Sequence, residues 1–107
     1  MDRSTEMLPQ MLPDVDESTG IEPLRIPPYK VIFLDDPKTS MEFVIRLLIG
    51  IFGKDPESAA RLMWEVHTQG ASHVTTLSKE QAELKQQQVH AAARAEGFPL
   101  RCIIEPA

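Results

Sequence analysis

Residues 29–44 read YKVIFLDDPKTSMEFV, in which an apolar run is followed by two aspartates and then by the signal for a helix start. Its first part, Tyr29 to Leu34, is a short run of apolar and β-branched residues, which predicts a strand that is apolar on both faces and therefore central in a sheet. The next three residues, DDP, interrupt the run, because a proline disfavours helical dihedrals in the residue before it. Thr39-Ser40-Met41-Glu42 has the pattern of a capping box, so we expect a helix to begin there with Thr39 as its cap.

Two helices are expected in the middle of the chain. The first is apolar nearly all round and should be largely buried until Gly50 or Gly53 ends it. The second opens with Asp55 as its cap and Pro56 at its first position, and it ends at Gly70. Its inner face is predicted to carry four apolar residues at helical spacing: Ala59, Leu62, Met63 and Val66.

Two further strands and a third helix complete the prediction. His73 to Leu77 is a weaker strand, and the capping box at Ser78 opens a polar helix that ends at Gly97. Leu100 to Glu105 alternates between apolar and polar residues, as a half-buried strand does. The order β-α-α-β-α-β predicts an α+β fold, a two-layer sandwich in which three helices cover one face of a three-stranded antiparallel sheet.

The chain divides into two parts of different composition. Residues 1–28 contain five of the nine prolines and six of the sixteen acidic residues but only two of the eleven basic ones. This segment lacks sustained periodicity, so we expect a disordered acidic extension, and residues 29–107 must then supply the core of one small domain.

Charge and composition exclude several classes of partner. The formal net charge is −5 and no basic patch is evident, which argues against nucleic acid and anionic lipid. The longest apolar run is too short to span a bilayer, and nothing at the N-terminus resembles a secretion signal, so we expect a cytoplasmic protein. The single cysteine, Cys102, lies in an alternating strand and is expected to be a buried thiol.

Three side chains are candidates for binding chemistry. Asp35 and Asp36 follow a strand directly, and His67 lies at the edge of the apolar face of the second helix, four residues after Met63. Adjacent aspartates are often only turn and cap residues, and a lone helix histidine is often partly buried without a ligand. Together they would form a pocket with a polar mouth and an apolar floor, suited to an ammonium group beside an apolar side chain, as at the free N-terminus of a peptide. A metal site that adds His73 is an alternative, but its spacing fits no established ligand pattern.

Several of these segments, in this order, resemble the ClpS adaptors of the Clp protease. The resemblance covers essentially all of residues 29–107 and is carried by three motifs: Tyr29-Lys-Val-Ile with Asp-Asp and Thr39-x-Met41-Glu42-Phe43-Val44, then Leu62-Met63 with Val66-His67-x-Gln69-Gly70, then Pro99-Leu100-x-Cys102. It implies a non-catalytic adaptor, without cofactor or metal, that binds the free N-terminal residue of N-degron substrates and delivers them to a Clp AAA+ unfoldase. Large apolar or aromatic first residues, Phe, Tyr, Trp and Leu, are the expected substrates, and a monomer suffices.

The resemblance also implies roles for individual residues. Asp35, Asp36 and His67 would bind the amine, and Met41 would be the gate that rejects β-branched first residues. The wall of the side-chain pocket would be formed by Thr39, Met41, Val44, Met63, Val66 and Leu100. Glu80 and Lys85 align with residues that bind the unfoldase, although exposed charges on a helix are often plain solvated surface.

This chain departs from the family pattern at the pocket mouth. Asp35 stands where the family has asparagine, Pro37 where it has a second aspartate, Lys38 where an aromatic residue is common, and Ser40 where proline is usual. An alternative function is therefore an interaction domain that docks on an AAA+ or other assembly with its N-degron pocket impaired. That alternative predicts no preference for a free N-terminus.

Overall fold

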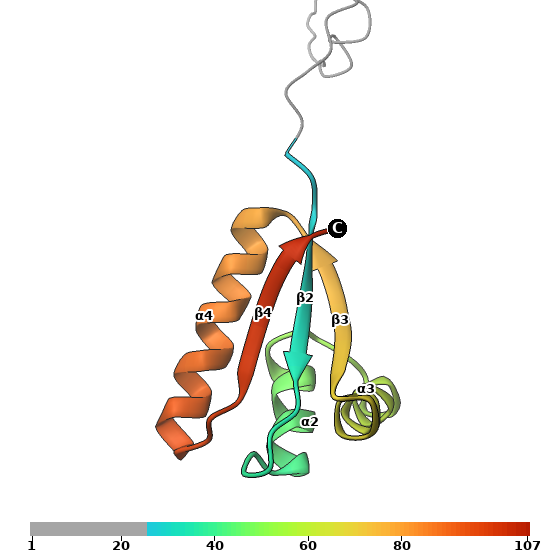
Figure 1. Ribbon diagram of the computed structural model, residues 1–107, viewed down its shortest axis with the longest axis vertical. Coiled ribbons are helices and arrows are strands. Elements are labelled where there is room, and N and C mark those ends of the chain that lie inside the picture. The colour runs from blue at the N-terminus through green and yellow to red at the C-terminus, as the bar shows by residue number, and fades with distance from the viewer. Residues whose placement is uncertain (1–25) are drawn as a thin grey trace, which may run out of the picture.

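The computed structural model describes residues 26–107, which form an α+β sandwich of a three-stranded sheet and three helices (Figure 1). The elements follow in the order β2 (Tyr29–Leu34), α2 (Met41–Gly50), α3 (Pro56–Gln69), β3 (Ala71–Leu77), α4 (Lys79–Glu96) and β4 (Arg101–Pro106). This is the β-α-α-β-α-β order predicted from the sequence, with all helices on one side of the sheet. The predicted acidic extension lies outside the described residues except for residues 26–28.

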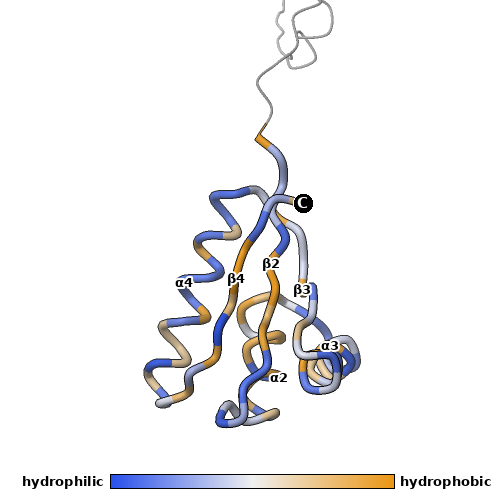
Figure 2. Tube along the Cα trace, viewed as in Figure 1, coloured by the Kyte–Doolittle hydropathy of each residue, from blue (hydrophilic) through white to orange (hydrophobic). Residues whose placement is uncertain are grey.

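The sheet is antiparallel in the order β3-β2-β4, so β2 is the central strand, as its two apolar faces predicted. Val31 and Phe33 of β2 are fully buried beneath the helices, whereas Ile32 on the opposite face is only half-buried. The central strand and α2 are the most hydrophobic segments, and α4 is mainly hydrophilic (Figure 2). The core therefore lies between β2 and the helical layer.

One element boundary, one cap and the burial of one helix differ from the sequence prediction. The strand expected at His73 begins two residues earlier, because Ala71 pairs with Leu34 as soon as the chain leaves the left-handed residue Gly70. The cap of α2 is Ser40, whose hydroxyl accepts the N–H of Phe43 at 3.1 Å, so the prediction of Thr39 was wrong. Helix α2 is also less buried than expected, since the side chain of Ile49 is 39% exposed.

The other predicted caps are confirmed. Asp55 accepts the N–H of Ser58 at 2.8 Å at the start of α3, and Ser78 accepts the N–H of Gln81 at 3.2 Å at the start of α4. Gly70 and Gly97 end these two helices in the left-handed conformation.

Two side chains of helix α4 form hydrogen bonds with backbone groups of Cys102 in β4. The Gln86 amide donates to the Cys102 carbonyl at 2.9 Å, and the Cys102 N–H donates to His90 Nε2 at 3.0 Å. Burial lowers the pKa of His90, with a further contribution from the nearby positive charges of Arg94 and Arg101. Cys102 is fully buried, as predicted, and burial raises the pKa of its thiol to about 12.

Candidate functional site

A cavity of about 620 Å³ opens between the loop after β2, the first turn of α2, and α3. Its volume lies within the usual range of small-ligand pockets, roughly 300–1,000 Å³. Eight of the predicted site residues line it: Asp35, Asp36, Thr39, Met41, Val44, Met63, Val66 and His67. The structure thus brings together side chains that are up to 32 positions apart in the sequence, from Asp35 to His67.

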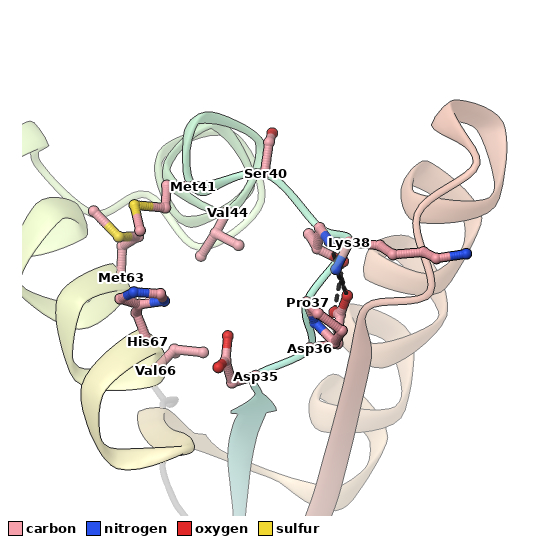
Figure 3. A pocket seen from close by; sticks show the side chains of 11 residues that line it. Asp35, Asp36, Pro37, Lys38, Ser40, Met41, Val44, Met63, Val66 and His67 are labelled. Atoms are coloured by element: carbon pink, nitrogen blue, oxygen red, sulfur yellow. Dashed lines mark hydrogen bonds between the residues drawn. The ribbon is translucent and has the colours of Figure 1, made fainter.

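Asp35 and His67 are positioned by one shared backbone contact. The Asp35 N–H donates to the carbonyl of Gly70 at 3.0 Å, which ties the end of β2 to the end of α3. Gly70 has a φ of 88°, a conformation in which glycine carries no penalty from a side chain, and its own N–H bonds to Val66. This junction places Asp35 and the last turn of α3, including His67, on the same side of the cavity mouth (Figure 3).

The Asp35 carboxylate points into the cavity together with the His67 imidazole (Figure 3). No hydrogen bond or ion pair with another residue of the range 26–107 engages that carboxylate. His67 is exposed, and its imidazole contacts the Trp64 ring edge to face at 5.7 Å between centroids. A carboxylate and an imidazole nitrogen are thus both available as hydrogen-bond acceptors at the mouth.

Asp36 lines the cavity, and its carboxylate also accepts hydrogen bonds within the loop. Oδ1 accepts the N–H groups of Lys38 and Thr39, each at 2.8 Å, and Oδ2 accepts the Thr39 hydroxyl at 2.6 Å. Burial raises the pKa of Asp36, but these hydrogen bonds outweigh burial, so the pKa is lowered overall. The Thr39 hydroxyl is thus directed at Asp36, and the next residue, Ser40, caps α2.

The apolar wall of the cavity comes from two helices. Val44 of α2 and Met63 and Val66 of α3 are each at most 6% exposed, whereas Met41 at the mouth is 38% exposed. Met41, Met63 and His67 all line the cavity, with Met41 on α2 and the other two on α3 (Figure 3). The cavity therefore has polar acceptors on one side and apolar side chains on the other.

Three predicted residues lie outside this cavity. Leu100 is 4% exposed and belongs to the buried core, not to the cavity lining. Glu80 is exposed in the first turn of α4, and Lys85 donates from Nζ to the carbonyl of Ile51 at 2.9 Å. Helix α4 begins at the end of the sheet opposite to the loop after β2 (Figure 1).

The structure adds three lining residues that the sequence had marked only as departures from a pattern: Pro37, Lys38 and Ser40. Their position in the loop between Asp36 and Met41 was the signal in the sequence that could have identified them as lining residues.

The metal alternative is not supported, because residues 26–107 contain no group of three or more side chains able to hold a metal ion. His73 instead bonds to Thr76 on β3 at 2.8 Å. In the same range, no helix is long and apolar enough to cross a membrane.

Known proteins share both the sequence and the fold of this chain. The family described as ATP-dependent Clp protease adaptor protein ClpS matches residues 25–103. The chain belongs to the ClpS family. The ClpS adapter proteins of Oleidesulfovibrio alaskensis and Methylococcus capsulatus are 47% and 46% identical to it. The first alignment covers 72% of this chain and 74% of the relative, and the second covers 78% of each.

A solved structure of this family holds a ligand. Agrobacterium tumefaciens ClpS2, bound to L-phenylalaninamide, superimposes with a TM-score of 0.75 and 31% identity, over 78% of this chain and all of the other. That ligand has a free α-amine and an apolar side chain, the two groups for which the cavity described above has acceptors and an apolar wall.

Proposed function

We propose that this ClpS protein binds the free N-terminal residue of N-degron substrates in the cavity between β2, α2 and α3. The single observation that supports this most is that Asp35, whose carboxylate has no hydrogen bond or ion pair with the other residues of 26–107, lies with His67 at the mouth of an apolar pocket. The protein then acts as a non-catalytic adaptor, which presents the substrate to a Clp unfoldase.

Asp35 and His67 are proposed as the acceptors for the substrate's ammonium group. A protonated α-amine has three donors, and burying it without acceptors is costly. Each charged hydrogen bond contributes about 1.5–3 kcal/mol, and a fully buried apolar side chain adds a similar amount. Two such bonds and one buried side chain contribute roughly 4.5–9 kcal/mol before the cost of association is subtracted.

Asp36 is proposed as a positioning residue and not as a third acceptor. Its carboxylate already accepts three hydrogen bonds from Lys38 and Thr39, which fixes the loop that carries Asp35 at one end and Met41 at the other. We propose this positioning role in place of the amine-binding role predicted for Asp36, and we keep the proposed roles of Thr39, Met41, Val44, Met63 and Val66 around the side chain.

Glu80 and Lys85 are proposed as part of the surface that meets the unfoldase. They lie on α4, which starts at the end of the sheet away from the pocket, so substrate and unfoldase could be bound at the same time. Action in the cytoplasm as a monomer stays a prediction from the sequence, as does the disorder of residues 1–28.

Fluorescence anisotropy of labelled peptides tests the proposal. Peptides that begin with Phe or Leu should bind, whereas a peptide that begins with Ile should bind at least about tenfold more weakly, because its branched Cβ meets Met41. Binding of none of the three would favour the alternative of a docking domain without N-degron recognition, whereas equal affinity for all three would contradict the gate at Met41.

A further inference from the structure

Trp64 is the one tryptophan of the chain, and it lies on α3 immediately outside the pocket. Its side chain is 52% exposed, whereas its neighbour Met63 is 6% exposed and lines the cavity. The indole contacts the His67 imidazole edge to face, with 5.7 Å between the ring centroids. Trp64 therefore continues the mouth of the pocket outward, past the residue proposed to bind the amine.

An indole so exposed has no packing role that accounts for it. It is absent from the core cluster of residues 26–107 and from the partly buried residues packed against that cluster. Met41, on the other helix of the mouth, is 38% exposed and lines the same cavity as His67 (Figure 3). Apolar surface is thus left open beside the cavity mouth, and tryptophan is among the residues that contribute most to binding at interfaces.

We propose that Trp64 forms a second subsite, which binds an apolar side chain at one of the two positions after the substrate's N-terminal residue. The inference rests on the proposed function, because it places the α-amine at His67. An extended peptide advances about 3.3 Å per residue. Its second and third residues are therefore within reach of a ring whose centroid is 5.7 Å from that of His67.

The second subsite makes the adaptor selective for the residues that follow the substrate's N-terminal residue. The cavity selects the first residue, and Trp64 then favours substrates in which an apolar residue follows it closely. A ligand of one residue ends at the cavity mouth and does not reach the indole. Phenylalaninamide is therefore the internal control that separates the second subsite from the first.

Isothermal titration calorimetry with four ligands provides the test: phenylalaninamide, Phe-Gly-Gly-amide, Phe-Leu-Gly-amide and Phe-Gly-Leu-amide. In the wild type, at least one leucine peptide should bind about fivefold more tightly than Phe-Gly-Gly-amide. In Trp64→Ala this advantage should vanish, while the affinity for phenylalaninamide stays within about twofold. Trp64→Phe should keep part of the advantage.

The matched control is Leu84→Ala, which removes another exposed apolar side chain, 45% exposed, from α4. It should leave all four affinities unchanged. Because Trp64 is the only tryptophan, its emission in the wild type should also shift to shorter wavelength with the favoured leucine peptide and not with phenylalaninamide.

The outcomes separate the two proposals. No leucine advantage in the wild type, or an advantage that persists in Trp64→Ala, would overturn the second subsite alone. An equal loss of affinity for all four ligands in Trp64→Ala would also overturn it, because the indole would then act by orienting His67. Failure of the wild type to bind phenylalaninamide would overturn the proposed function and this inference with it.

Discussion

Replacing Asp36 separates a residue that holds the pocket loop from one that touches the ligand. The Asp36→Ala variant loses hydrogen bonds from the Lys38 N–H, the Thr39 N–H and the Thr39 hydroxyl, which are 2.8, 2.8 and 2.6 Å long. At a half-exposed site each contributes about 1 kcal/mol net, and since the three are not additive we expect a loss of roughly 2 kcal/mol in the free energy of unfolding. The binding of phenylalaninamide should weaken about tenfold, because Asp35 and Met41 lose their fixed spacing.

The Asp36→Asn variant separates the effect of the loop hydrogen bonds from the effect of the charge. Its amide oxygen can still accept the two backbone N–H groups, and its NH₂ can donate to the Thr39 hydroxyl oxygen, so the loop is kept while the charge is removed. Urea denaturation and calorimetry should show less than about half of the stability loss of Asp36→Ala and a change in affinity of no more than about threefold. If Asn weakens binding as much as Ala does, the Asp36 charge acts on the ligand directly and the positioning role is refuted.

Further predictions concern the gate, the shared junction and the edge of the sheet. Met41→Ala should admit peptides that begin with Ile or Val, and an unchanged preference in anisotropy titrations would count against the gate. Gly70→Ala should cost about 1 kcal/mol in urea unfolding, because its φ of 88° disfavours a Cβ, and it should also weaken binding through Asp35. Since the pKa of His90 is lowered in the folded state, the unfolded chain binds more protons, so stability should fall as the pH drops through about 6.5. His90→Gln should flatten that part of the pH profile of unfolding, and a profile identical to the wild type would contradict the assignment.

The arrangement of the elements was predictable because the local signals agree with one another. The two apolar faces of Tyr29–Leu34 indicated a central strand, and Asp55, Ser78, Gly70 and Gly97 marked helix ends that the structure confirms. The cap of α2 was not predictable in the same way, since Thr39 and Ser40 are both good caps. In the structure the Thr39 hydroxyl donates to Asp36, and Ser40 is the cap.

The site was predictable as a set of residues but not as a division of roles. Sequence alone placed Asp35 and Asp36 side by side, and only the loop conformation shows that one carboxylate faces the cavity while the other accepts three hydrogen bonds within the loop. Leu100 has the alternation of a strand residue, but its inward face belongs to the core. Trp64 is not among the residues predicted for the inner face of α3, and nothing in the helical spacing pointed to its contact with His67.

The most direct test of the account compares phenylalaninamide with N-acetyl-phenylalaninamide by calorimetry, in the wild type and in Asp35→Ala. Acetylation removes the positive charge and leaves the phenyl ring unchanged. The account predicts that the wild type binds the free amine at least about a hundredfold more tightly than the acetylated form, and that Asp35→Ala loses at least about tenfold of this difference. Equal binding of the two ligands by the wild type would contradict the central claim that this cavity recognises a free N-terminus.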